Sequence, residues 1–205
     1  LDALLLALRG RVSPALVAGL GELGVRAVGL TGLDGGLARA RRKAALTTVD
    51  PSGRVRVVRD DRSGAITGVD PTLLLVLLGA GYVPVVSPPA AGGADGPLSV
   101  DADRLAAALA GAIGAAAAVF LSDVPGLLRD PADPHSLIAR VQADDEAALS
   151  AAAGRMRLKV LAAREALAAG VRRVVIADGR RQRPVRAALA GQGTVVEAAS
   201  GALSR

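Results

Sequence analysis

The stretch LSVDADRLAAALAGAIGAAAAVFLSDVPGLL, residues 98–128, places two carboxylates directly before a helical pattern. Apolar residues then recur at a spacing of four, at Leu105, Leu109 and Ile113. This spacing puts them on one face of a helix, which Asp101 and Asp103 therefore open. An aspartate at such a position commonly caps the free amides of the first turn. Asp101 is thus either a helix cap or a functional side chain, and the pattern leaves both open.

The same stretch ends in the pattern of a buried strand followed by a polar turn. The apolar run Ala117–Leu121 is closed by Ser122-Asp123-Val124-Pro125-Gly126. In open α/β sheets, ligands bind where strands end at their carboxyl edge. The turn after residue 121 is therefore a candidate ligand site.

Helical and strand patterns alternate along the remaining sequence. Helices are expected over residues 1–8, 13–23 (with Ser13 as the cap and Pro14 in the first turn), 71–78, 144–168 apart from Gly154, and 184–190. Strands are expected over residues 25–30, 82–86, 171–177 and 193–196, with a hairpin around 54–58. This alternation predicts an α/β fold with a mostly parallel sheet and helices on both faces. Residues 90–96 have the composition of a flexible connection between two lobes.

Composition narrows the class of protein. The chain has 205 residues, of which 51% are hydrophobic, and it contains no cysteine, so disulfides and thiolate chemistry are excluded. No uninterrupted apolar run has the length of a membrane span, which predicts a soluble cytoplasmic protein. The formal net charge is +6, yet aromatic residues are 1%, which argues against a nucleic-acid-binding module. An acidic macromolecule or a phosphorylated ligand fits the charge equally well.

The chain resembles the amino acid kinase family over nearly its whole length. Residues 98–128 are similar to the family's helix-opening element and to its Ser/Thr-Asp-Val-x-Gly turn, which receives the nucleotide. Similar segments follow the family's order: AVGLTGLDG at 27–35, GYVPVVSPP at 81–89, GRMRLKV at 154–160 and ADGR at 177–180. The details look most like the acetylglutamate kinase branch, and within it the kinases whose substrate is linked to a small acidic carrier protein.

The resemblance implies the family's three-layer α/β/α fold. It also implies an acyl-substrate and carrier lobe over residues 1–90 and a nucleotide-binding lobe over 91–205. In the family, a strand with a Lys-x-Gly-Gly loop and a second Gly-Gly loop precede the helix in which Leu1 lies. We therefore expect the sequence to be an amino-terminally truncated member that lacks the first βα unit.

The implied activity is ATP-dependent phosphorylation of the side-chain carboxylate of an N-blocked glutamate or 2-aminoadipate, in arginine or lysine biosynthesis. Only Lys43 and Lys159 are lysines among 25 basic residues, so Lys159 suggests that a compact point charge is needed at its position, which by resemblance is at the phosphates. A lysine that only extends from a helix surface is the alternative reading. By resemblance, Lys159 stabilises the transition state and Asp103 orients the catalytic lysines. Mg²⁺ is expected to bind through the ATP phosphates, with no protein metal site.

Further roles also rest on the resemblance. Substrate-binding positions are Ser99, Asp101, Gly32 and Asp34; nucleotide-binding positions are Ser122, Asp123, Val124, Pro125, Gly126, Leu127, Gly154, Arg155 and Met156. Ser99 stands where acetylglutamate kinases commonly have an asparagine, so substrate identity stays open. The glycine-rich loop around residue 32 would by itself be read as a turn. His135, the single histidine, has no neighbouring acid or second histidine at ligand spacing.

Partners can be assigned only as alternatives. Arg41, Arg42 and Lys43 form either a solvated face or a dock for the acidic carrier protein. A homodimer is expected. Within the fold, glutamate 5-kinase and carbamate kinase are rivals that the GRMRLK and ADGR elements disfavour. An alternative function is a truncated, catalytically weak nucleotide-binding or regulatory module.

Overall fold

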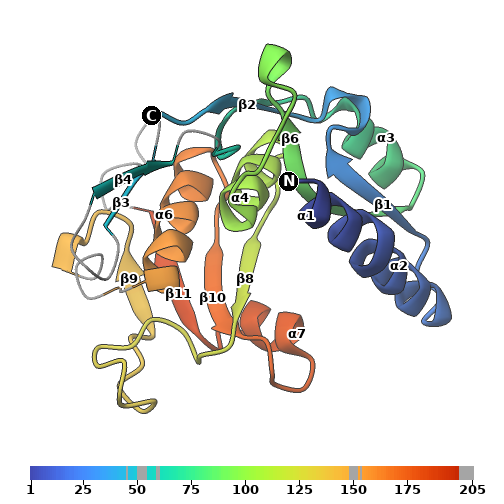
Figure 1. Cartoon of the computed structure of the whole chain (residues 1–205). Coiled ribbons are helices and arrows are strands. Elements are labelled where there is room, and N and C mark those ends of the chain that lie inside the picture. Colours follow the sequence, from blue (N-terminus) through green and yellow to red (C-terminus); the bar gives the residue numbers. More distant parts are fainter. Residues whose placement is uncertain (45, 50–54, 59–60, 148–151, 153, 199–205) are drawn as a thin grey trace. The chain divides into compact units, whose positions relative to one another are not determined.

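The structure is a computed structural model that describes residues 1–44, 46–49, 55–58, 61–147, 152 and 154–198. It divides into two compact units, which we call unit 1 (Leu1–Leu105) and unit 2 (Ala106–Arg205). Figure 1 labels their helices and strands. Each unit is an α/β structure, which confirms the predicted fold class.

The division falls after Leu105, whereas the sequence predicts lobes that meet at residue 90. The reason is that the segment between them pairs within unit 1. Strand β6 (Val83–Ala91) continues through a 3₁₀ turn, η3 (Gly93–Asp95), into the antiparallel strand β7 (Pro97–Leu98). Ser99 then forms a parallel bridge with Ser63. The prediction that residues 90–96 are a flexible connection is therefore wrong, because they form a paired hairpin.

Unit 1 is built on a five-stranded mixed sheet in the order β1-β6-β2-β5, with β7 added next to β6. The strands not yet given are β1 (Ala27–Gly32), β2 (Ala38–Arg42) and β5 (Gly64–Val69). β1 and β6 are parallel, and helix α3 (Thr72–Gly79) leads into β6. The backbones of β3 (Leu46–Val49) and β4 (Val55–Val58) form the predicted antiparallel hairpin, while residues 50–54 lie outside the described part.

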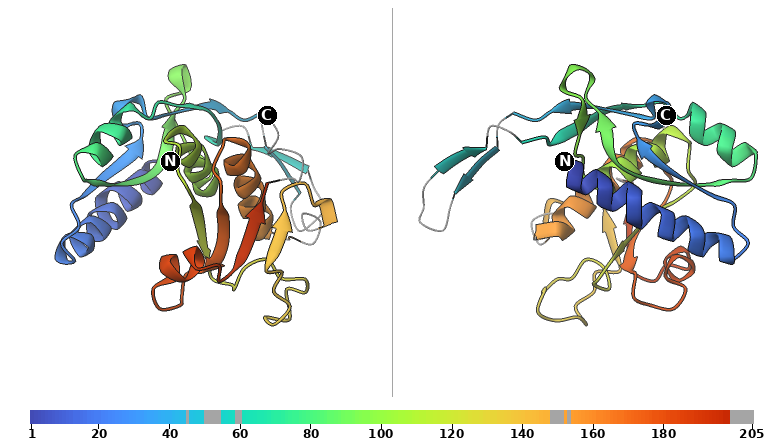
Figure 2. Two further views of the ribbon diagram at one scale, coloured as in Figure 1. Left: turned by 180° about the vertical axis from the view of Figure 1, so that it is seen from behind. Right: turned by 45° about the vertical axis from the view of Figure 1, so that its right-hand side comes forward.

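A single long helix precedes β1. Helix α1 (Asp2–Ala7), a π-helical segment η1 (Leu8–Val12) and helix α2 (Ser13–Glu22) follow one another without a break, as both views in Figure 2 show. The sequence predicts two helices with Ser13 as a cap; instead Ser13 is helical and 5% exposed. It lies against Gly29 of β1, where an added Cβ would be 2.3 Å from the Ser13 Oγ. A small side chain at position 13 is therefore explained by close packing of the helix on β1 and not by capping.

The segment Asp2–Glu22 is the one helix among the described residues that is long and apolar enough to cross a membrane, with a mean hydropathy of 1.5 in its best window. One such helix near an amino terminus is weak evidence, since core helices and signal sequences have the same character. The sequence expectation counted uninterrupted apolar runs, and Arg9 and Arg11 interrupt this one. Arg9 also donates to the Gly29 carbonyl at 2.6 Å, which ties the helix to β1.

Unit 2 contains a four-stranded sheet in the order β8-β10-β11-β9. Its elements are β8 (Ala118–Ser122), β9 (Arg140–Gln142), α6 (Gly154–Ala168), β10 (Val174–Asp178), α7 (Pro184–Leu189) and β11 (Thr194–Glu197). Helix α4 (Ala102–Ala112) begins in unit 1 and ends in unit 2. The pairs β8–β10 and β9–β11 are parallel and β10–β11 is antiparallel, so this sheet is also mixed.

Side chains of β10 alternate between the two faces of this sheet. Val174 and Ile176 belong to the core that α6 covers, and both are 0% exposed. Val175 and Ala177 belong to a second cluster with Ala188 of α7. Helices therefore cover both faces of β10, as the sequence predicts. Burying each valine or isoleucine side chain fully stabilises the fold by roughly 1.5–3 kcal/mol.

Candidate functional site

In unit 1, the loop after β1 is organised by an aspartate. Asp34 accepts hydrogen bonds from the Thr31 backbone N–H at 2.6 Å and the Thr31 hydroxyl at 2.8 Å. The Arg9 guanidinium lies 3.7 Å from the same carboxylate. Partial burial acts to raise the pKa of Asp34, but these hydrogen bonds and the Arg9 charge outweigh it and lower the pKa. The predicted substrate residue Asp34 thus also has a structural role in its own loop.

Gly32, the other predicted substrate residue of this loop, lies at a close crossing of backbones. A Cβ added there would be 2.6 Å from the Pro89 carbonyl oxygen and 3.1 Å from the Ala38 Cβ. The register between β1 and β6 also shifts at this point. A glycine is needed here because no side chain fits between the strands.

The start of α4 carries three more predicted residues. Ser99 is held by its backbone, which donates to the Arg62 carbonyl at 2.8 Å and accepts from the Gly64 N–H at 2.7 Å. Asp101 accepts from the Arg104 N–H at 2.9 Å, which is the geometry of a helix cap. The cap reading of Asp101 is therefore confirmed, and its substrate-binding role stays a prediction. Asp103 lies in the first turn of α4 and is half-buried.

The basic run at the end of β2 is exposed. Arg41, Arg42 and Lys43 all present accessible side chains in unit 1. Arg42 is tied down, since its Nε donates to the Asp61 carbonyl at 3.0 Å and its Nη1 lies 3.9 Å from the Asp95 carboxylate. Carrier docking by these residues stays a prediction.

In unit 2, two parallel strands end side by side at one sheet edge. Ser122 at the end of β8 is in register with Asp178 at the end of β10, and the Gly179 N–H donates to the Ser122 carbonyl at 2.8 Å. The predicted nucleotide turn, residues 122–127, leaves the sheet here. Only residues 169–173 join α6 to β10, so helix and strand run in opposite directions. The first turns of α6 therefore also lie toward this edge.

The predicted residues of α6 differ in their environments. Gly154 starts the helix with a φ of 53°, a conformation that glycine adopts readily. Met156 packs against the apolar core of unit 2, which gives it a structural role. Lys159 is half-buried. The Arg155 backbone is helical, while its side chain lies outside the described part of the chain.

An ion pair at the end of β10 was not among the predicted site residues. The Arg180 guanidinium binds Asp178 through two hydrogen bonds of 2.9 and 2.8 Å, and the Arg180 backbone N–H adds a third of 2.9 Å. These bonds lower the pKa of Asp178 to about 2. The hydrogen bonds to Asp178 also raise the pKa of Arg180, and the negative charge of Asp123 adds to this increase. Asp123 of the predicted turn thus lies within electrostatic reach of this pair. The signal in the sequence was the Asp-Gly turn directly after an apolar run.

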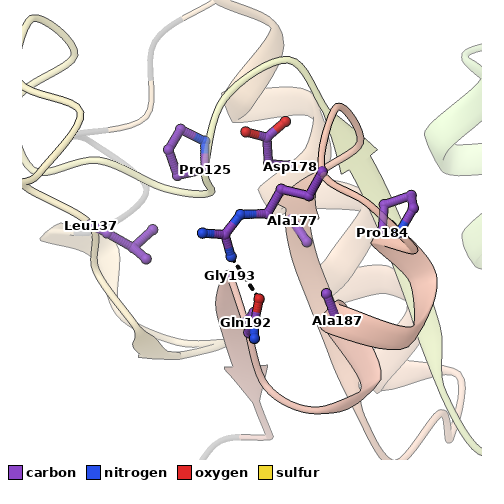
Figure 3. A pocket seen from close by; sticks show the side chains of 9 residues that line it. Pro125, Leu137, Ala177, Asp178, Pro184, Ala187, Gln192 and Gly193 are labelled. Carbon is purple, nitrogen blue, oxygen red and sulfur yellow. Dashed lines mark hydrogen bonds between the residues drawn. The ribbon is translucent and has the colours of Figure 1, made fainter.

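A pocket of about 140 Å³ adjoins the same edge (Figure 3). Apolar walls come from Pro125, Leu137, Ala177, Pro184 and Ala187, and polar groups from Asp178, Arg181 and Gln192. Arg181 donates to the Gln192 side-chain oxygen at 2.6 Å, the dashed line in Figure 3. Pockets that enclose a whole small ligand usually measure roughly 300 Å³ or more. This one can therefore take only part of a ligand that lies along the turn.

His135 lies in an exposed loop, and its backbone N–H donates to the Asp133 carboxylate at 2.8 Å. Among the residues that the structure describes, no group of three or more histidine, aspartate or glutamate side chains is placed to hold a metal ion.

The fold and the strand-end turns define an α/β protein with a candidate nucleotide-binding edge in unit 2. A family model described as "Amino acid kinase family" matches residues 3–178. The chain belongs to the amino acid kinase family. The resemblance seen in the sequence is therefore confirmed.

Curated relatives extend this finding. A [LysW]-aminoadipate kinase of Deinococcus radiodurans is 49% identical over 188 residues, covering 91% of this chain and 64% of that protein. A protein of the same name from Thermus thermophilus is 45% identical, with 91% of this chain and 70% of that protein covered. An acetylglutamate kinase of Methanopyrus kandleri is 38% identical, with 96% and 76% covered. The chain thus spans less than two thirds of the length of the Deinococcus radiodurans relative.

Solved structures of lower identity show the same fold. An N-acetylglutamate synthase from Neisseria gonorrhoeae, complexed with coenzyme A and N-acetyl-glutamate, has a TM-score of 0.72 at 24% identity, covering 93% of this chain and 42% of that one. The carbamate kinase of Giardia lamblia bound to AMP-PNP has a TM-score of 0.62 at 17% identity, covering 91% and 71%.

Proposed function

We propose that this chain acts in the ATP-dependent phosphorylation of the side-chain carboxylate of an N-blocked glutamate or 2-aminoadipate, forming an acyl phosphate in lysine or arginine biosynthesis. The observation that carries the proposal is the identity of 49% and 45% to two [LysW]-aminoadipate kinases, in each case over 91% of the chain. Identity at this level over most of the chain supports a shared fold and a related reaction.

Phosphoryl transfer to a carboxylate needs positive charge near the transferring oxygens and does not need a general base. A carboxylate oxygen of the acceptor attacks the γ-phosphorus of ATP, the bond from that phosphorus to the β-γ bridging oxygen breaks, and ADP leaves. The acceptor is already ionised at neutral pH. Catalysis then consists of positioning and of stabilising charge on the transferring oxygens. Lys159 supplies such a charge in this proposal, and Asp103 acts on the orientation of Lys159.

The nucleotide is assigned to unit 2 and the acceptor to unit 1. The turn of residues 122–127 supports the first assignment, because it follows the carboxyl end of a parallel strand and carries backbone amides and the Ser122 hydroxyl. Gly154, Arg155 and Met156 complete the proposed nucleotide contacts. The β1 loop around Gly32 and Asp34 and the start of α4, with Ser99 and Asp101, support the second.

Mg²⁺ is proposed to bind with ATP. When bound, it would neutralise charge that develops on the phosphate oxygens. The carboxylates Asp123 and Asp178 at the unit 2 edge are hard oxygen donors, but Arg180 holds Asp178 through two hydrogen bonds. Phosphate oxygens would therefore supply most of the ligands.

The partner of the proposed reaction is a small acidic carrier protein that presents the acceptor. Arg41, Arg42 and Lys43 form an exposed basic run in unit 1, and complementary charge speeds the association of such partners. A homodimer is also proposed.

The two lysines of the chain offer a matched test. The protein, expressed from its full reading frame, is assayed for ATP-dependent acyl phosphate by trapping with hydroxylamine. Acceptors are N-acetylglutamate, N-acetyl-2-aminoadipate and carrier-linked 2-aminoadipate. Lys159→Ala is expected to lower turnover about 10²-fold or more with every acceptor. Lys43→Ala is expected to weaken only the reaction of the carrier-linked acceptor.

Unchanged turnover in Lys159→Ala would remove this lysine from the mechanism. ATP binding without acyl phosphate from any acceptor would instead favour a nucleotide-binding module. Equal loss with free and carrier-linked acceptors in Lys43→Ala would contradict the docking role.

A further inference from the structure

A threonine hydroxyl is buried beneath the candidate nucleotide turn. Thr194, the first residue of β11, is 0% exposed. Its Oγ1 donates to the Ile138 carbonyl at 2.7 Å and accepts from the Leu127 N–H at 2.8 Å. One hydroxyl thus satisfies a donor and an acceptor of two different backbone segments.

The hydroxyl takes the place of a backbone hydrogen bond. Directly opposed residues of an antiparallel pair often exchange two N–H to carbonyl bonds. Between Leu127 and Ile138 one such bond is direct, from the Ile138 N–H to the Leu127 carbonyl at 2.8 Å. The second runs through the Thr194 hydroxyl. The next residues, Leu128 and Leu137, form an antiparallel bridge. The end of the turn is therefore fastened to β11 by a side chain.

The same residue limits how the turn approaches the sheet. A Cβ added at Gly126 would be 2.6 Å from the Thr194 Oγ1 and 3.0 Å from the Thr194 backbone nitrogen. Val195, the next residue of β11, donates its N–H to the Ala139 carbonyl at 2.9 Å. The start of β11 thus holds both the turn and the segment that returns from it.

We propose that Thr194 is a positioning residue that fixes the turn of residues 122–127 in its nucleotide-binding conformation. This inference rests on the proposed function, because it needs ATP to bind at that turn. Loss of the hydroxyl leaves the Leu127 N–H and the Ile138 carbonyl buried without this partner. The turn then has to move to find new partners, and the amides offered to the nucleotide move with it.

The test compares Thr194→Val, which keeps the side-chain shape and loses the hydroxyl, with Thr194→Ser, which keeps the hydroxyl. Ser136→Ala is the matched control, since the Ser136 hydroxyl also bonds backbone, at Asp130, in the loop that follows the turn. Calorimetry with ATP and Mg²⁺ measures Kd, and hydrogen exchange measures protection of the Leu127 amide. Thr194→Val is expected to raise Kd about tenfold and to lose this protection.

Thr194→Ser is expected to restore both values to within about twofold of the unaltered protein. Ser136→Ala is expected to lower the melting temperature without changing Kd. If Thr194→Val does not fold, Gly126→Ala perturbs the same contact from the other side and is expected to raise Kd as well.

An unchanged Kd in folded Thr194→Val, or in Gly126→Ala where that variant has to replace it, would overturn this proposal alone. Failure of the unaltered protein to bind ATP would overturn the proposed function and this proposal together.

Discussion

Substitutions of Asp101 can distinguish its role as a helix cap from its proposed role in binding the acceptor. Its carboxylate accepts the Arg104 N–H at 2.9 Å at the start of α4. Replacing such a cap by alanine costs about 1 kcal/mol, within a range of roughly 0.5–2. Removing the negative charge near the positive end of the helix dipole costs about 0.3–1 kcal/mol more. For a chain of this size, each 1 kcal/mol lowers Tm by about 2–4 °C. Asp101→Ala is thus expected to melt roughly 3–6 °C lower.

Asp101→Asn is the informative companion, because an asparagine caps as well as an aspartate but carries no charge. Thermal unfolding followed by circular dichroism gives Tm for both variants, and the hydroxylamine assay gives their turnover. If the carboxylate only caps, Asn keeps the turnover and loses only the charge contribution, about 1–4 °C of Tm. If it also binds the acceptor, Asn shows the same small loss of Tm and in addition raises the acceptor KM.

The reasoning about the cap would be refuted by an Asp101→Ala protein with the Tm of the unaltered chain. A Tm that falls equally in Asn and Ala variants would assign the stabilisation to charge alone. The activity assay cannot alter either conclusion, because the cap is predicted to affect the stability of the fold.

Other substitutions test the packing and the electrostatics. Gly32→Ala forces a Cβ to 2.6 Å from the Pro89 carbonyl and should lower the free energy of unfolding in urea by about 1–3 kcal/mol, whereas an unchanged midpoint would contradict the close crossing. Gly19→Ala in α2 meets nothing within 4 Å and should raise that free energy by about 0.5–1 kcal/mol. Arg180 lowers the pKa of Asp178 to about 2 in the folded protein, whereas the pKa of an aspartate in the unfolded chain is about 3.9. The ionised Asp178 therefore stabilises the fold above about pH 3.9, and this stabilisation is lost as the pH falls toward 2. The stability gap between the unaltered chain and Asp178→Asn should therefore narrow between about pH 5 and 2, and a constant gap would contradict the ion pair.

The sequence predicts those elements whose pattern is local. The strand that ends at Ser122 is bounded by an apolar run and a polar turn, and the start of α4 by two acids before a periodic face, and both lie where predicted. Strand β9 was missed because its three residues are too few to show a period. The hairpin of β6 and β7 was read as a linker because its glycines and prolines resemble one, although pairing across the turn fixes it.

The candidate sites divide in the same way. The positions that matched a motif could be named in advance, but their contacts could not. Thr194 reads as an ordinary strand residue, and its importance depends on Leu127 and Ile138, which are far from it in sequence. Likewise, Met156 sits in a motif yet packs in the core. Such roles come from tertiary contacts that no local pattern contains.

The hydrogen bonds of three aspartates bear on which side chain could act as a base in the proposed reaction. Asp34, Asp101 and Asp178 each lie near a strand end or helix start, and each accepts a backbone N–H. The pKa values of Asp34 and Asp178 are lowered by their hydrogen bonds, which makes these two groups weak proton acceptors at neutral pH. A kinase for hydroxyl acceptors needs a base to take the hydroxyl proton. A carboxylate acceptor brings its own negative charge and needs no such base. Asp34 and Asp178 are therefore assigned to the structure of their own loops and not to general-base catalysis, which the proposed acyl phosphate product does not require.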